Sequence, residues 1–327
     1  MSVGLDIGTM NIVSARQQDD KVHTRRIRDA FLDLPLHAKK VLKLSKSSFM
    51  QRDGDLLLLG DQALEMAIIF GKEVRRPLSQ GLVSPSEIHS LEVLGYLIQE
   101  VLGLSADKET CFFSIPAAPV DNLSKDVIYH KGVFERIVTE CGYKAIASNE
   151  AMAIIFAEAA VEGFSALSFS FGSGMTNIAL AFNGIEGMVF SVERGGDWID
   201  GGAARSLGSP QSRLCHIKEV GIDLLAPKNR DEEALTFYYR ELINYVLDWV
   251  QKEFTKRQLY NVVTRPVPVI LSGGTSKAGN FVHLFREEYE KRKKKFSLPI
   301  SEIRAATDPL NAVAKGLLIQ AINEDED

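Results

Sequence analysis

Two segments far apart in the chain share one pattern of apolar and polar positions. Residues 4–15 read GLDIGTMNIVSA, and residues 168–181 read SFSFGSGMTNIALA. In each segment an alternating apolar run meets a glycine-rich turn with hydroxyl and amide side chains, and a second β-type run follows. The pattern predicts two β-hairpins, one in each half of the chain.

The sequence after each turn separates the possible phosphate-binding folds. P-loops and dinucleotide-binding loops lead into a helix whose N-terminus faces the phosphate. Here both turns lead into strand-like runs, no GxxxxGK[ST] motif occurs, and Asn177 stands where the last glycine of GxGxxG would be. Backbone N–H groups of a tight turn can still bind an anion. Two unrelated hairpins remain an alternative, but the paired pattern favours a duplicated phosphate clamp.

Other patterns and the composition narrow the class of protein. Residues 88–101 read as a largely apolar helix, and residues 111–115 read as a buried strand that ends at Pro116. The 327 residues suffice for two domains, and 45% apolar with 25% charged residues is typical of soluble globular proteins. The net charge of −5 gives no general attraction to nucleic acid or to anionic membranes.

Several features indicate a soluble protein of a reducing compartment, and we expect it in the cytoplasm. The three cysteines lie far apart, which disfavours disulfides and zinc sites. A strand-like pattern starts at the third residue and leaves no room for a signal peptide. No run of about 18 apolar residues occurs that could span a membrane. Leu102 and Leu104 could form only a weak membrane anchor and are interpreted as loop packing.

The order of the motifs resembles the actin, sugar-kinase and heat-shock-chaperone superfamily, and among its members most closely the bacterial MreB-type actins. In chain order the matching segments are DIGTMN (6–11), SNEAMA (148–153), FGSGMT (171–176), GGDWID (195–200), HIKE (216–219), VILSGGTS (269–276) and DPLNAVAKG (308–316). Two segments depart from the family. Ala151 replaces a proline, and Ser170 replaces the aspartate that usually precedes the second turn.

The resemblance implies an α/β fold of the two-domain, actin-like (ribonuclease H-like) type, with the nucleotide in the cleft between the domains. Domain I would comprise residues 1–160, with a C-terminal helix at 308–322 packing back on it. Domain II would comprise residues 161–307. Its outer lobe, near residues 205–235, is short compared with that of MreB.

The resemblance also implies a site for ATP or GTP with Mg2+. Asp6 would hold the metal through its waters, and Glu150 would position or activate the attacking water. A carboxylate that merely suits the start of a helix is the alternative for Glu150. Lys218 and Glu219 would hold the ribose and base. The nucleotide-binding residues would be Gly8, Thr9, Met10, Asn11, Gly172, Ser173, Gly174, Met175, Gly196, Lys218, Glu219, Gly273, Gly274 and Thr275.

The serine at position 170 bears on catalysis. A hydroxyl in place of a carboxylate removes one negative charge from the outer shell of the metal. We therefore expect slow or absent hydrolysis, a weak ATPase at most, with nucleotide binding retained.

Three functions remain in order of preference. The first is a nucleotide-dependent protein that polymerises with itself into cytoskeletal or positioning filaments. The alternative is a non-polymerising switch or assembly module of the chaperone-like or pilus-assembly type. A small-molecule kinase ranks last, because no base aspartate facing a substrate pocket is evident. Direct nucleic-acid binding is not expected, and membrane contact would be weak at most.

Charged segments outside the motifs are interpreted as solvated surface. The runs KRKKK (291–295) and RRIR (25–28) are interpreted as solvated helix ends, and the tail NEDED (323–327) is expected to be disordered. The six histidines show no spacing suited to zinc.

Overall fold

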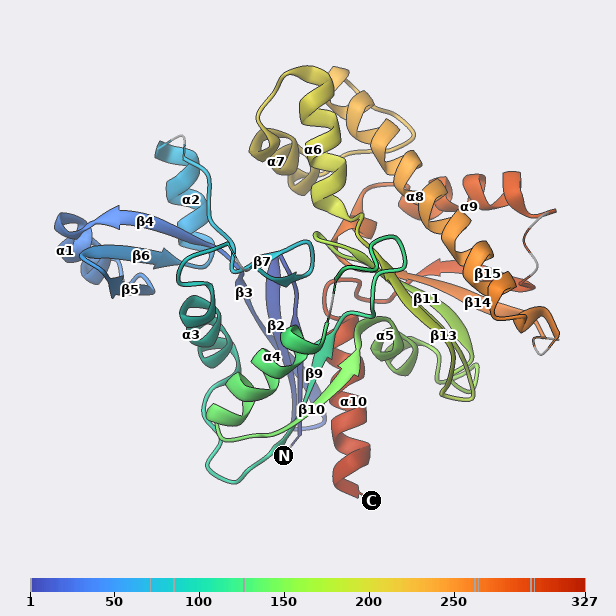
Figure 1. The fold of residues 1–327 in the computed structure, drawn as a ribbon, viewed down its shortest axis with the longest axis horizontal. Coiled ribbons are helices and arrows are strands. Elements are labelled where there is room, and N and C mark those ends of the chain that lie inside the picture. Colours follow the sequence, from blue (N-terminus) through green and yellow to red (C-terminus); the bar gives the residue numbers. More distant parts are fainter. Residues whose placement is uncertain are drawn as a thin grey trace.

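Two five-stranded sheets with the same strand arrangement form the centre of the molecule (Figure 1). The computed structural model describes residues 2–70, 72–84, 86–125, 127–261, 263, 265–294, 296 and 298–326. The first sheet has the order β10-β9-β1-β2-β3, with β1 (Val3–Ile7), β2 (Asn11–Gln18), β3 (Lys21–Arg28), β9 (Thr110–Ile115) and β10 (Lys144–Asn149). The second has the order β13-β12-β11-β14-β15, with β11 (Ala166–Phe171), β12 (Thr176–Phe182), β13 (Ile185–Val192), β14 (Val267–Ser272) and β15 (Ile300–Ala305).

The two predicted hairpins occupy the same place in the two sheets. β1 and β2 pair antiparallel down to Ile7 opposite Ile12, and β11 and β12 pair antiparallel down to Phe171 opposite Thr176. On the other side, β1 pairs parallel with β9, and β11 pairs parallel with β14. The internal similarity of the sequence therefore reflects a repeated sheet topology.

Two helices lie between the sheets, where close packing depends on glycine. α5 (Glu150–Glu158) contacts β11 and β12, and α10 (Ala312–Glu326) contacts β1, β9 and α5. A Cβ atom added at Gly316 would lie 1.7 Å from the carbonyl oxygen of Ala153, so only glycine fits at this helix crossing. A Cβ atom at Gly4 would lie 2.1 Å from the carbonyl oxygen of Ala314 in the same way.

The outer faces of the sheets carry helix pairs whose apolar sides form the two main cores. α3 (Ser90–Leu102) and α4 (Ile128–Glu140) cover the first sheet. α8 (Arg230–Lys256) and α9 (Phe281–Arg292) cover the second, where Phe169, Phe171, Phe281 and Phe285 pack as an aromatic cluster.

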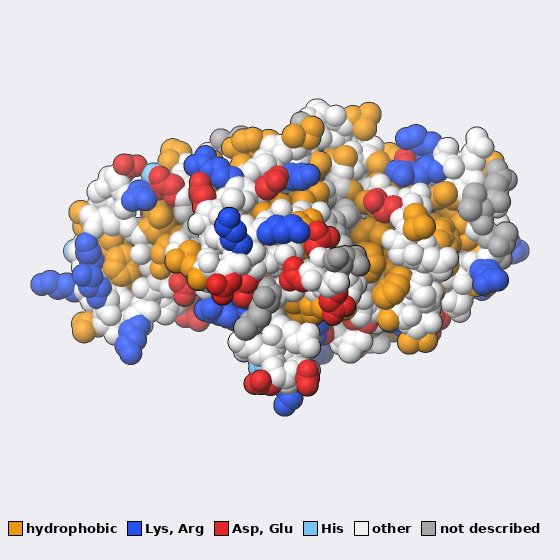
Figure 2. All heavy atoms as spheres, turned by 90° about the horizontal axis from the view of Figure 1, so that it is seen from below, with side chains coloured by type: hydrophobic (Ala, Val, Ile, Leu, Met, Phe, Trp, Pro, Cys, Tyr) orange, Lys and Arg blue, Asp and Glu red, His pale blue; other side chains and the backbone are white. Residues whose placement is uncertain are grey.

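Each sheet also carries a small lobe at the entrance to the cleft. On the first sheet the lobe consists of β4 (Phe31–Pro35), η1 (Leu36–Ala38), α1 (Lys39–Leu44), β5 (Phe49–Arg52), β6 (Asp55–Leu59) and α2 (Asp61–Phe70), followed by the short hairpin β7 (Leu78–Ser79) and β8 (Leu82–Val83). Residues 36–50 contain four lysines and no acidic residue, and Lys and Arg side chains gather at this end of the molecule, on the left of Figure 2. On the second sheet the lobe consists of α6 (Gly196–Leu207) and α7 (Gln211–Val220), which pack on α8. Residues 205–235 contain helices and loops, with one isolated β-bridge between Asp223 and Gly279.

Short 3-10 helices complete the elements. η2 spans Leu259–Asn261, and η3 spans Gly274–Lys277 directly after β14.

Two expectations about charged segments are wrong. The tail is not disordered through residue 326, because α10 continues to Glu326 and the Asp325 carboxylate accepts hydrogen bonds from Thr110 Oγ1 (2.5 Å) and Ser2 Oγ (2.8 Å). Residue 327 lies outside the described residues. The RRIR run is not a helix end either, because it forms the last half of strand β3, and its final arginine points into the cleft.

Candidate functional site

The turns of the two hairpins face one cavity of about 590 Å³ between the two sheets. This volume is within the range of small-molecule sites. Of the residues expected to bind the metal and the nucleotide, all but Gly196 line the cavity: Asp6, Gly8, Thr9, Met10, Asn11, Glu150, Gly172, Ser173, Gly174, Met175, Lys218, Glu219, Gly273, Gly274 and Thr275. Segments that are far apart in the chain are thus brought together as the motif order predicts.

The two turns have the same backbone geometry. In the first, the N–H of Gly8 donates to the carbonyl of Asn11 (3.0 Å), and in the second, the N–H of Gly172 donates to the carbonyl of Met175 (3.1 Å). A Cβ atom at Gly8 would lie 3.0 Å from that Asn11 oxygen, and one at Gly172 would lie 2.9 Å from that Met175 oxygen. Both turns are therefore tightly closed, which is the arrangement that turns backbone N–H groups toward an anion.

The first and second turns also contact each other. A Cβ atom at Gly174 would lie 2.6 Å from Thr9 Oγ1 and 2.2 Å from the backbone nitrogen of Gly81, in the hairpin between β7 and β8. The second turn thus packs against two segments of the first half of the chain. Because Gly174 has no side chain, the second turn can come close enough to the first for both turns to contact one ligand.

Gly196 supports the second turn from behind. Its N–H donates to the carbonyl of Gly172 (2.9 Å), and the Oγ1 of Thr275 donates to the same oxygen (2.9 Å). The N–H of Asp197 donates to the carbonyl of Ser173 (2.9 Å). Because these residues open α6 and follow β14, the turn is fixed by regular elements of the second sheet.

Two carboxyl groups lie close together in the cavity wall. Asp6 comes from β1, and Glu150 is the first residue of α5, whose N-cap Asn149 accepts from the backbone N–H groups of the next turn. Both line the cavity and are half-buried. Burial raises the pKa of Asp6 to about 6, partly offset by a hydrogen bond with Ser114. Burial and then the charge of Asp6 raise the pKa of Glu150 to about 8.

Ser170 contacts Glu150 directly. The carboxylate Oε2 of Glu150 accepts from Asn177 Nδ2 (2.9 Å) and lies 3.5 Å from Ser170 Oγ, which also donates to it. Ser170 and Asn177 are opposite each other in the hairpin of β11 and β12. Glu150 is thus held in the cavity rather than on the surface, which argues against the alternative of an ordinary solvent-facing helix start.

These residues suit a magnesium ion held mainly by water and phosphate. Among the described residues, no group of three or more His, Cys, Asp or Glu side chains could hold a metal ion. Mg2+ commonly keeps several waters and uses one or two carboxylates together with substrate phosphates. Asp6 and Glu150 both line the cavity, and none of the ion pairs among the described residues involves either carboxyl group, so their oxygens are available to a divalent ion and its waters.

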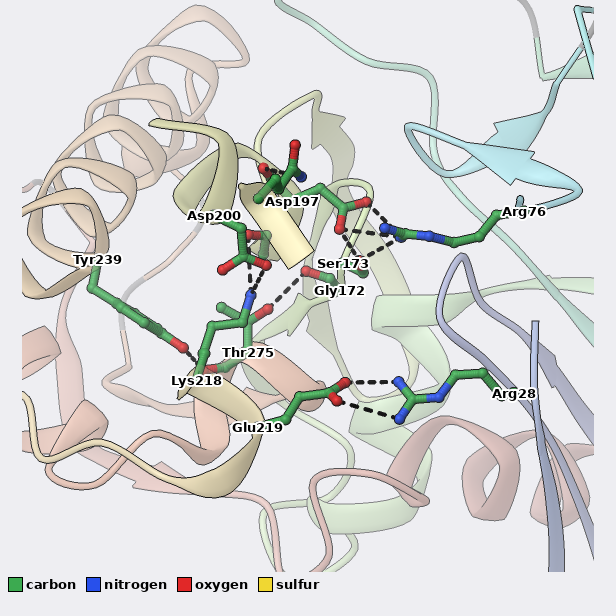
Figure 3. A network of polar contacts seen from close by, with 12 residues as sticks. Arg28, Arg76, Gly172, Ser173, Asp197, Asp200, Lys218, Glu219, Tyr239 and Thr275 are labelled. Atoms are coloured by element: carbon green, nitrogen blue, oxygen red, sulfur yellow. Dashed lines mark hydrogen bonds and ion pairs between the residues drawn. The ribbon is translucent and has the colours of Figure 1, made fainter. Parts of the chain in front are cut away.

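The pair expected to hold ribose and base, Lys218 and Glu219, already has protein partners (Figure 3). Lys218 Nζ donates to the buried carboxylate of Asp200 (2.6 Å) and to the carbonyl of Gly196 (3.1 Å). Glu219 accepts from Arg28 Nη1 (2.7 Å) and Nη2 (3.4 Å). Lys218 is therefore fixed within the second half of the chain, whereas Glu219 is joined to the first half.

Sequence reasoning missed several residues of the cavity wall. Besides the expected residues, the wall includes Arg26, Arg28, Gly81, Cys215, Tyr239, Lys277 and Leu310. Tyr239 is fully buried and donates from its hydroxyl to the carbonyl of Thr275 (3.3 Å). Apart from Leu310, which lies in the DPLNAVAKG segment, these positions belong to none of the matching segments, and only the tertiary arrangement brings them to the site.

Fold and site together define an actin-like protein, with two related sheets and a hairpin turn from each at a common cleft. A family model described as Volactin matches residues 1–321. The chain belongs to the Volactin family.

Solved structures with this fold include bacterial actins. The chain is similar to MamK in a structure described as a double helical filament (TM-score 0.72, 15% identity, 98% of each chain covered). It is similar to MreB5 of Spiroplasma citri bound to AMPPNP (TM-score 0.68, 15% identity, 99% of this chain and 97% of that one). It is also similar to the ethanolamine utilization protein EutJ from Carboxydothermus hydrogenoformans (TM-score 0.57, 16% identity, 97% and 89%).

No curated protein matches the sequence. Within the described part of the chain, every helix is too short or too polar to cross a membrane.

Proposed function

We propose that this protein binds ATP or GTP together with Mg2+ between its two hairpin turns and polymerises with itself into filaments. The observation that carries the proposal is the pair of equivalent turns, Gly8–Asn11 and Gly172–Met175, facing one cavity. In this assignment the division into residues 1–160 and 161–307, with the last helix returning to the first part, places one turn in each domain.

The relatives support both parts of the proposal. MreB5 was solved with AMPPNP and with ADP, and MamK was solved as a filament. A MamK variant described as non-polymerising was solved with AMPPNP, so in that protein nucleotide binding does not require assembly. Binding and polymerisation of the present chain therefore need separate measurements.

Within the site, the residues take the following roles. Asp6 would hold the metal ion through its waters, and Glu150 would accept a hydrogen bond from the attacking water. The bound Mg2+ would neutralise charge on the phosphates. Backbone N–H groups of the two turns hold the phosphates, and Glu219 holds the ribose. Because Ser170 supplies a hydroxyl where a third carboxylate would otherwise stand, hydrolysis is slow.

A second candidate is a nucleotide-dependent module that does not polymerise. The similarity to EutJ and the serine at position 170 favour it. The two candidates share the nucleotide site and differ only in assembly.

Ultracentrifugation distinguishes the filament-forming protein from the non-polymerising module. The protein should pellet with Mg2+ and AMPPNP and stay in the supernatant with EDTA, and electron microscopy of the pellet should show filaments. Gly172→Ala, which adds a methyl group to the second turn, should abolish pelleting, and Gly132→Ala, at an open helical position, should leave it unchanged. A supernatant protein that nevertheless binds nucleotide would support the second candidate, whereas amorphous pellets in every buffer would contradict filament formation.

A further inference from the structure

Two arginines from the first half of the chain cross the cleft to the second half (Figure 3). Arg76 donates from Nη1 to both carboxylate oxygens of Asp197 (3.1 and 2.9 Å) and lies 3.4 Å from Ser173 Oγ. Arg28 donates to both oxygens of Glu219. Arg28 lines the cavity, whereas Arg76 is not part of its wall. A ligand in the cavity could therefore contact the Arg28–Glu219 pair, whereas the Arg76–Asp197 pair joins the two halves of the chain outside the cavity wall.

Arg28 is tied to the first phosphate turn through the backbone. It is the last residue of β3 and is opposite Asn11 in the antiparallel pairing with β2. The N–H of the next residue, Asp29, donates to the carbonyl of Met10 (3.0 Å). One residue thus connects the turn that would hold phosphate with the carboxylate that would hold ribose.

The arginine is also held firmly. Its side chain is only 16% exposed, against 35% for Glu219, and Asp61 lies 3.8 Å from Nε as a second acidic neighbour. A planar guanidinium bound to both oxygens of a carboxylate fixes the orientation of that carboxylate. Glu219 is the second-last residue of α7, and without Arg28 its side chain would be free to leave the cavity.

A carboxylate can accept hydrogen bonds from an arginine and from hydroxyl groups together, because its two oxygens offer about four acceptor sites. We infer that Arg28 is a positioning residue for the nucleoside: it aims Glu219 at the ribose hydroxyls across the cleft. The inference rests on the proposed nucleotide site and adds to it a residue that determines selectivity for ribose.

A substitution of Arg28 does not remove every contact across the cleft, because Arg76 still binds Asp197. Asp197 opens α6 and holds Ser173 Oγ at 2.7 Å, so Arg76 continues to join the two halves when Arg28 is changed. Arg26 offers a matched control, since it lines the same cavity from the same strand and none of the described ion pairs involves it.

The test compares dissociation constants for ATP and 2′,3′-dideoxy-ATP by calorimetry in the full chain, with Arg28→Gln, Arg28→Lys and Arg26→Gln. Loss of either arginine removes one positive charge near the phosphates and weakens both ligands, so the ratio of the two constants is the readout. A site that bonds to ribose hydroxyls leaves polar groups unpaired with the dideoxy ligand, and we expect the wild type to prefer ATP by about 10-fold or more.

We expect Arg28→Gln to reduce this preference to about threefold or less, Arg28→Lys to restore it in part, and Arg26→Gln to leave it unchanged. An unchanged ratio in Arg28→Gln, with ATP still bound, would overturn the inference and leave the proposed function standing. A wild type without any nucleotide binding would overturn both.

Discussion

At the residue scale, the site combines two half-buried carboxyl groups, and none of the ion pairs among the described residues involves either of them. Asp6 and Glu150 both have raised pKa values because they are buried and, for Glu150, because Asp6 is its neighbour. In the ligand-free protein this arrangement costs stability once both groups are ionised. Such a cost is typical of sites that are completed by a ligand.

The unfavourable ionisation of Glu150 in the folded protein predicts how the free energy of unfolding depends on pH. The folded protein holds a proton on Glu150 up to about pH 8, whereas the unfolded chain releases it near 4.5, so stability falls as pH rises between these values. Glu150→Gln removes the titrating group. In EDTA, its free energy of unfolding relative to that of the wild type should rise by at least about 1 kcal/mol between pH 5 and pH 8.5.

Chemical denaturation at the two pH values measures the difference, and Glu186→Gln, at an exposed strand position, serves as the control. A Glu150→Gln protein whose stability relative to the wild type does not rise between the two pH values would contradict the assignment of an unfavourable buried charge.

The proposal that hydrolysis is slow because of Ser170 can be tested by substitution at this position. Ser170→Asp restores a carboxylate beside Glu150, where it can bind waters of the metal ion. We expect phosphate release to accelerate and the Mg2+ concentration for half-maximal rate to fall by about 10-fold. Ser170→Asn, which has similar size and no charge, should leave both quantities near wild type. Equal rates for Ser and Asp at this position would show that the serine is not the reason for slow turnover.

At the element scale, the position of the cleft depends on two helices packed between the sheets. α10 crosses α5 and β1 at distances that only glycine permits, with Gly316 against Ala153 and Gly4 against Ala314. The apolar residues of this layer, among them Ala151, Ile155 and Leu317, are buried. A shift of α5 would move Glu150, which is its first residue.

The crossing predicts opposite effects of one substitution at two helical positions. Gly316→Ala forces a methyl group against a backbone carbonyl and should destabilise the protein by about 1–3 kcal/mol. Gly132→Ala, within α4 and with no atom near the new methyl group, should stabilise it by about 0.5–1 kcal/mol. Thermal unfolding of the two variants measures both effects. A Gly316→Ala protein as stable as the wild type would show that the helices do not approach so closely.

Local pattern predicted the elements that have a strong signal in the sequence. Alternation around a glycine turn identified both hairpins, and the apolar run before Val101 identified α3 within two residues of its start. The same reasoning failed for residues 25–28, because three arginines with one isoleucine carry no clear period. It also failed for the tail, whose order depends on Thr110 and Ser2, far away in the chain.

At the scale of the whole molecule, two equivalent sheets bring their turns to one cleft. The order of the motifs predicted this arrangement and half of the residues in the cavity wall, because the glycine turns have a pattern that can be read in the sequence. Arg28 could not be predicted, since its partner Glu219 is 191 positions away and neither residue belongs to the other's motif. The sequence also could not show that Gly196 binds the carbonyl of Gly172 from behind the second turn instead of lining the cavity.

Calorimetric titration with Mg2+ and AMPPNP tests the central claim most directly. If both turns hold one polyphosphate, the wild type binds one nucleotide per chain, and Gly8→Ala and Gly172→Ala each weaken binding by at least about 10-fold, since each adds a methyl group to a closed anion-binding turn. Binding that survives unchanged when one turn is altered, or the absence of saturable binding to the wild type, would contradict the claim.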